Sequence, residues 1–74
     1  MDRTEIRKKL FEAYGQKWSK ILAERTERSR VLIRRVMAND MPDRSGIVNA
    51  AIKMLNDYND EQRKVKEQLM ELLK

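Results

Sequence analysis

The chain of 74 residues contains no cysteine and no histidine, and only two glycines and one proline. The lack of cysteine excludes a disulfide framework, and without histidine the usual zinc-ligand clusters are missing as well. The two glycines stand apart and form no phosphate-binding loop, and the acidic residues are scattered among basic ones rather than paired for acid–base chemistry. We therefore expect no enzymatic activity, no bound metal or cofactor, and no small-molecule substrate.

Long apolar runs are also missing, because no stretch approaches the roughly 20 apolar residues of a membrane-spanning helix. The first residues, 1–5, are mostly charged and lack the apolar centre of a signal peptide. We expect no membrane partner and a cytoplasmic protein. A chain of this size buries only about 60% of the surface that it exposes when unfolded, so its stability is marginal and self-association would add to it.

Charge is abundant and unevenly distributed. Charged residues make up 39% of the chain, and the formal net charge is +5. Residues 1–39 hold 11 Lys and Arg against 5 Asp and Glu, a net charge of +6, whereas residues 40–74 hold 6 against 7, a net charge of −1. A surface that binds nucleic-acid phosphates needs such a local excess of positive charge. The alternative is an uneven distribution by chance in a highly charged protein.

The sequence is organised around residues 22–36, which predict a short helix, a tight turn and a second helix. Ala23 supplies a small side chain where the two helices approach each other. In the second helix the apolar Ile33 and Val36 are three residues apart, so they fall on one face. The other faces of this helix carry arginines that are free to meet another molecule.

Five positions of this stretch form a pattern with fixed spacing: Leu22, Ala23, Ser29, Ile33 and Val36. With this pattern the stretch resembles the helix-turn-helix of Cro- and repressor-type DNA-binding domains. The wider segment 14–51 is also similar to very small helix-turn-helix proteins of Bacteroidetes and their mobile elements. In the family the turn usually carries glycine followed by an apolar residue, whereas Glu27 and Arg28 stand here. A non-glycine residue with a positive φ costs on the order of 1 kcal/mol, so we expect a strained or reshaped bend with an exposed charge.

The resemblance implies that residues 29–38 enter the major groove of DNA and that the protein acts near the bacterial nucleoid. Arginine can bind guanine O6 and N7 with two hydrogen bonds, and valine can touch a thymine methyl group. The implied base contacts are Ser29, Arg30, Val31, Arg34 and Arg35. The implied phosphate contacts are Gln16, Lys17, Lys20 and Arg28. The alternatives are a capping role alone for Ser29, and a solvated face or phosphate contacts for the arginines.

Capping residues and apolar spacing predict the helices that precede the motif's turn. Thr4 is the expected N-cap of a helix over 5–14, which Gly15 ends, and a second helix is expected over 16–23. Large apolar and aromatic side chains of this region are expected to form a core cluster rather than a stacking platform for bases: Leu10, Phe11, Tyr14 and Trp18.

The motif's second helix is expected to stop near residues 38–39, because asparagine tolerates the left-handed conformation and a proline follows shortly after. Asp43 or Ser45 is the expected start of the next helix. Gly46 then falls in its first turn, which we interpret as a place where another backbone passes close.

The last part of the chain carries an uninterrupted heptad pattern of mostly apolar residues: Val48, Ala51, Leu55, Tyr58, Gln62, Val65, Leu69 and Leu72. We expect a helix-turn-helix domain of about four helices over 1–56 and an amphipathic helix over 57–74. The latter is expected to pair with a second copy through Tyr58, Val65, Leu69, Leu72 and Leu73. In the alternative, a break over 56–60 lets this helix fold back on the first one.

These observations predict an all-α protein that binds double-stranded DNA sequence-specifically, as a dimeric transcriptional regulator or an accessory factor of a mobile element. Paired recognition helices about 34 Å apart would require a short inverted repeat. The alternative is a protein-interaction module, antitoxin-like or an adaptor, that docks through its C-terminal helix. A ribbon-helix-helix fold is less favoured, because the required alternating strand is missing.

Overall fold

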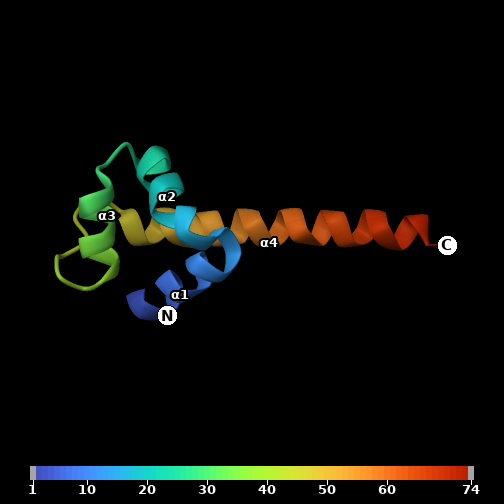
Figure 1. Ribbon diagram of the computed structural model, residues 1–74, viewed down its shortest axis with the longest axis horizontal. Coiled ribbons are helices and arrows are strands. Elements are labelled where there is room, and N and C mark those ends of the chain that lie inside the picture. The colour runs from blue at the N-terminus through green and yellow to red at the C-terminus, as the bar shows by residue number, and fades with distance from the viewer. Residues whose placement is uncertain (1, 74) are drawn as a thin grey trace.

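The computed structural model describes residues 2–73, which are helical throughout apart from short connections. The elements in chain order are α1 (Arg3–Tyr14), the 3₁₀ helix η1 (Gly15–Lys17), α2 (Trp18–Thr26), α3 (Arg30–Met37) and α4 (Ile47–Leu72). The first three α-helices gather around the N-terminal half of α4, and the rest of α4 projects from them as a rod (Figure 1). The expected all-α class is confirmed. The expected number of helices is wrong, because the last helix of the domain and the C-terminal helix are one. Residues 1 and 74, at the limits of the two expected segments, lie outside the described range.

The first helix begins earlier than the sequence suggested. The Asp2 carboxylate accepts a hydrogen bond of 2.9 Å from the backbone N–H of Glu5, so that Asp2 is the N-cap and Thr4 lies inside α1. An aspartate is at least as good an N-cap as a threonine, and here it is placed three residues before a free N–H. Gly15 ends α1 with a φ of 69°, as expected. The chain then makes the turn η1, so α2 begins two residues later than expected and extends beyond Ala23.

The bend between α2 and α3 contains a residue in the left-handed conformation that is not a glycine. Glu27 has φ 56° and ψ 37°, and the backbone N–H groups of Glu27 and Arg28 both donate to the carbonyl of Ala23. The Arg28 bond is the 6→1 bond of a Schellman motif and the Glu27 bond is the 5→1 bond of an αL motif, and both motifs normally favour glycine at the left-handed position. The Thr26 hydroxyl also donates to the Leu22 carbonyl at 2.8 Å. The helix, tight turn and second helix predicted over 22–36 are therefore confirmed, strained residue included.

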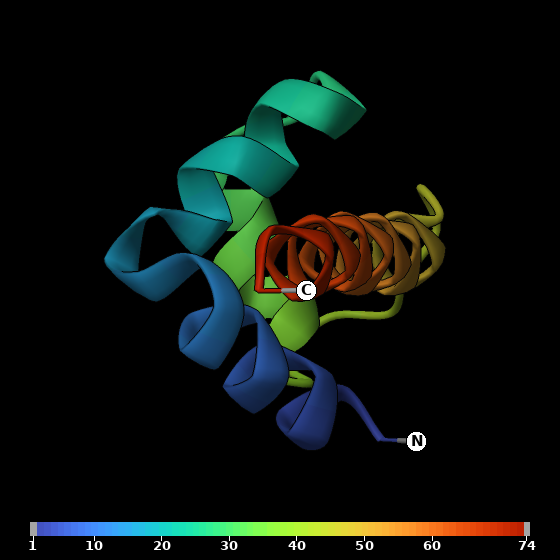
Figure 2. The same cartoon turned by 90° about the vertical axis from the view of Figure 1, so that its right-hand side faces the viewer.

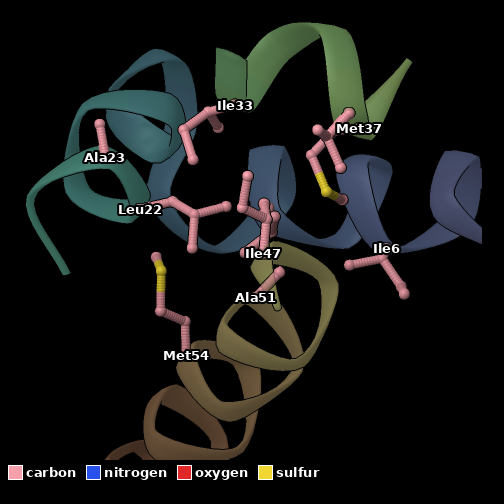
Figure 3. Close-up of a cluster of buried hydrophobic side chains, with 10 residues drawn as sticks. Ile6, Leu22, Ala23, Ile33, Met37, Ile47, Ala51 and Met54 are labelled. Carbon is pink, nitrogen blue, oxygen red and sulfur yellow. The ribbon is translucent and has the colours of Figure 1, made fainter. Parts of the chain in front are cut away.

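The core is a single apolar cluster to which all four helices contribute: Ile6, Leu10, Leu22, Ala23, Ile33, Val36, Met37, Ile47, Ala51 and Met54. Figure 3 shows the side chains of α4 pointing at those of α2 and α3. Tyr14 and Trp18 are half-buried against this cluster. Phe11 is 52% exposed, so its expected place in the core is wrong. The reason is helical geometry, because Leu10 points inward and the next residue is turned about 100° away.

The long helix α4 is unbroken over residues 56–60, which excludes the folded-back arrangement. Three contacts support this stretch: the Tyr14 hydroxyl donates to the Met54 carbonyl at 2.9 Å, the Tyr14 and Tyr58 rings lie 5.4 Å apart, and Arg25 pairs with Asp57 at 3.0 Å. Burial raises the pKa of Tyr14, so its hydroxyl stays protonated and remains a donor. Helix α1 is covered by the first half of α4 rather than by its end.

Helix α4 starts at a carboxylate that lies outside it. Gly46, with a φ of 71°, is its N-cap and lends no side chain, while the two Asp43 oxygens accept from the N–H groups of Ile47 and Val48 at 2.8 and 2.9 Å. A Cβ on Gly46 would meet no atom within 4 Å. Glycine is therefore required here by its positive φ, and the expected close backbone is wrong.

Removing this cap should lower stability in a pH-dependent way. Burial by itself raises the pKa of Asp43, but the backbone N–H groups of Val48, Ile47 and Ser45 outweigh it and hold the pKa below its ordinary value of 3.8. A carboxyl whose folded pKa is lowered stabilises the fold above its unfolded pKa of about 3.9, and this contribution is lost as the pH falls through the folded value.

We expect Asp43→Ala to reduce the free energy of unfolding by about 1–2 kcal/mol near neutral pH, measured by urea denaturation. The difference from the parent chain should stay constant above about pH 5 and shrink at lower pH. Asp60→Ala, which removes an exposed carboxylate of α4, is the control and should change stability by less than about 0.5 kcal/mol. A pH-independent difference would contradict the role of the ionised cap.

Candidate nucleic-acid interface

The outward face of α3 is defined by what its inward face buries. Ile33, Val36 and Met37 are each at most 1% exposed. Because these three side chains occupy one side of an eight-residue helix, four of the remaining five positions turn outward: Arg30, Arg34 and Arg35 are exposed, and Val31 is 63% exposed. Leu32 is half-buried against the core. The structure thus brings four of the five expected base-contacting residues onto one accessible helical surface.

The fifth, Ser29, lies at the start of this helix and is exposed. Its hydroxyl oxygen accepts a hydrogen bond of 3.2 Å from the backbone N–H of Leu32, which confirms the predicted cap. A serine hydroxyl that accepts still carries its own proton. Ser29 can therefore cap α3 and donate to a ligand at the same time.

The other end of α3 is held by a residue that the sequence did not reveal. The Arg3 guanidinium donates to the carbonyls of Val36 and Met41, at 3.1 and 2.7 Å. This joins the start of α1 to the last turn of α3 and to the loop that follows. A positive charge at a helix C-terminus also complements the helix dipole. No local pattern announces this contact, because its partners are more than 30 residues away along the chain.

A second arginine of α1 lies next to the exposed face of α3. Arg7 lines a hollow of about 350 Å³ together with Arg34 and Arg35. The other residues that line it are Trp18, Ala38 and Asp40. Three arginines from two helices thus line one hollow, together with one aspartate that offsets part of their charge. Arginine forks match phosphate oxygens geometrically, so this hollow has the chemistry of a phosphate site.

The four expected phosphate contacts lie around this surface. Gln16 and Lys17 belong to η1 and Lys20 to the first turns of α2, while Arg28 lies in the bend before α3; all four are exposed. Helices α2 and α3 lie side by side at the end of the molecule opposite the C-terminus (Figure 1). These residues therefore belong to the helical body formed around the first half of α4, and not to its projecting half; we refer to this body as the basic end.

The expected dimerisation residues lie elsewhere. Val65, Leu69, Leu72 and Leu73 follow one another along the projecting half of α4, with exposed fractions of 44, 55, 80 and 87%. Tyr58 differs from them, because it is half-buried and its ring packs against that of Tyr14. The structure therefore separates a basic end from an apolar stripe at the other end.

Comparison with known proteins returns no similarity that would assign a family: no protein-family profile, curated protein or solved structure matches the chain. Over residues 2–73, none of the helices combines the length and the apolar character that crossing a lipid bilayer requires.

The two arginines of α1 should have separable effects on stability. Arg3→Ala removes two hydrogen bonds, one to the Met41 carbonyl and one to the Val36 carbonyl, which keeps only the backbone N–H of Asn39 as a donor, so we expect a loss of about 1–2 kcal/mol in the free energy of unfolding. Arg7→Ala, one turn further along the same helix, removes an exposed side chain and should cost less than about 0.5 kcal/mol. Thermal and urea unfolding followed by circular dichroism measure both. Equal losses would show that Arg3 does not anchor α3.

Proposed function

We propose that this protein binds double-stranded DNA sequence-specifically, as a dimeric transcriptional regulator of the helix-turn-helix kind, with residues 29–38 in the major groove. The observation that carries the proposal is the exposed arginine face of α3, whose opposite face is fully buried. A helix with its side chains is about 10–12 Å across, and the major groove of B-form DNA is about 12 Å wide. The short α3 can therefore enter it without rearrangement of the fold.

The residues of α3 have distinct roles in this proposal. Arg30, Arg34 and Arg35 reach base edges or the phosphates that border the groove, and at least one of them binds guanine with two hydrogen bonds. Val31 supplies an apolar contact for a thymine methyl group. Ser29 donates its hydroxyl proton to a phosphate while its oxygen continues to cap α3.

Phosphates on either side of the groove are bound by the surrounding basic and polar residues. Arg28 contacts a phosphate beside the bend, and Gln16, Lys17 and Lys20 contact phosphates near the start of α2, whose first residue, Trp18, lines the hollow that Arg7 shares with α3. The hollow that Arg7 shares with α3 receives a phosphate at the other end of the recognition helix. These contacts fix the orientation of α3, and the base contacts supply specificity.

A second candidate function is supported by the exposed apolar stripe of α4. Leu69, Met70, Leu72 and Leu73 are all more than half exposed, as the anchors of a helix that docks on a different protein would be. In that case the basic end is incidental. Purification with a stoichiometric partner, and no retention on heparin or random DNA, would favour this candidate.

The proposal is tested by binding measurements on DNA selected from a random duplex library. If Arg34 or Arg35 binds a base, its replacement by alanine should weaken binding to the selected site by about 1–3 kcal/mol and relax the preference at one base pair. If it binds a phosphate, the loss should be similar for all sequences, and the slope of log K against log salt should fall by about 1. Fluorescence anisotropy over a range of salt concentrations separates the two.

Arg63→Ala is the matched control, because Arg63 is an exposed arginine on the projecting half of α4. It should leave both the affinity and the salt dependence unchanged apart from a small nonspecific effect. Unchanged binding by Arg34→Ala and Arg35→Ala, or an equal effect of Arg63→Ala, would show that α3 is not the DNA-binding surface.

A further inference from the structure

The core face and the exposed apolar stripe of α4 are the same face of one helix. Each of three buried residues of α4 has an exposed apolar residue 18 positions further along the helix. Ile47 corresponds to Val65, Ala51 to Leu69 and Met54 to Leu72. Eighteen residues are five full turns at 3.6 residues per turn. The projecting half therefore presents its apolar side in the direction in which the first half faces α1, α2 and α3.

This alignment decides how a second copy can approach. Viewed along α4, helices α1 and α2 lie to one side of it (Figure 2). In a parallel pair the apolar faces of the two α4 helices would meet along their length. Each copy's own helices would then occupy the space that the first half of the other α4 requires. In an antiparallel pair only the projecting halves overlap, and the remaining helices lie at opposite ends.

We propose that two copies pair through the projecting halves of α4 in antiparallel orientation, an inference that rests on the dimer of the proposed function and assigns its geometry. Four heptad positions lie beyond the half-buried Tyr58: Gln62, Val65, Leu69 and Leu72. Antiparallel pairing of these four alone places Gln62 against Leu72 of the second copy and Val65 against its Leu69. Leu55 and Tyr58 stay with their own copy, where they already pack.

The charge of the stripe favours a second copy over a nucleic acid. Residues 59–73 carry three basic and four acidic side chains, whereas residues 2–58 carry 13 basic and 8 acidic ones. Two nearly neutral segments meet without net repulsion, and their net charge does not attract phosphates. The exposed fraction increases from 44% at Val65 to 87% at Leu73, in the part of α4 that no other element of residues 2–73 covers.

The pairing sets the distance between the two recognition helices. It is centred on residue 67, so each Ile47 lies 20 residues from the centre, and the two Ile47 residues are separated by roughly 60 Å along the axis at 1.5 Å per residue. Helix α3 packs beside this end of α4 (Figure 1). The separation exceeds one turn of DNA, about 34 Å, and is close to two turns. One dimer of this kind therefore does not place its recognition helices in successive major grooves, as was expected from the sequence.

Disulfide trapping tests the pairing in the full chain, which has no cysteine of its own. We expect an oxidised equimolar mixture of Gln62→Cys and Leu72→Cys to form a covalent dimer that contains one copy of each variant. Each variant alone should remain uncrosslinked, because identical positions would be about 15 Å apart and a disulfide requires Cα atoms within about 7 Å. Both positions are exposed, so neither change disturbs the core.

A parallel pair gives the opposite result, because each variant then crosslinks with itself and the mixture forms few mixed dimers. That outcome overturns the proposal, as does a chain that sediments as a monomer at every concentration, or only together with a different protein. If the pairing is correct, Leu69→Glu should convert dimer to monomer in sedimentation with an unchanged helical circular dichroism spectrum.

The crosslinking experiment and the DNA-binding experiment test two different proposals, so that either can fail without the other. Mixed crosslinks in a chain that binds no DNA would uphold the pairing and refute the proposed function. DNA binding that depends on α3, with no mixed crosslinks, would do the reverse. Where both hold, a spacing of one turn between the half-sites of the selected DNA would still contradict the antiparallel geometry.

Discussion

The burial of three apolar side chains of α3 is the constraint on which the rest of the structure depends. Ile33, Val36 and Met37 leave almost no surface in water, and they can do so only if α3 crosses the first turns of α4 with its other faces outward. The bend that delivers α3 contains Glu27 in a left-handed conformation, at a cost on the order of 1 kcal/mol. Full burial of an apolar side chain contributes about 1.5–3 kcal/mol, so the three together outweigh that strain.

Local patterns in the sequence were sufficient to locate this motif. The three-residue spacing of Ile33 and Val36, the small Ala23 and the capping Ser29 each act within one or two helical turns, so their effect can be judged without knowing the fold. The same holds for Gly15, whose positive φ ends α1. The exposure of the α3 arginines can also be predicted from the local pattern, because they lie on the side of the helix opposite its apolar residues.

What the sequence did not reveal depends on contacts between distant segments. Arg3 and Arg7 look alike on α1, and only the arrangement of the helices makes one an anchor of α3 and the other part of a basic hollow. The stretch 56–60 is rich in residues that cap or end helices, yet it remains helical because Tyr58 and Asp57 are held by α1 and α2. Tertiary contacts outweigh helix propensities of a few tenths of a kcal/mol per residue.

The proposed function requires DNA to contact the exposed face of α3 and not the stripe of α4. The most direct measurement is a titration of the ¹⁵N-labelled protein with random-sequence duplex DNA, followed by the backbone amide signals of each residue. We expect the shifts to concentrate in residues 16–20 and 28–38 and to extend to Arg7, while the signals of residues 61–73 keep their positions. The absence of any shift, or shifts confined to residues 61–73, would contradict the proposed function.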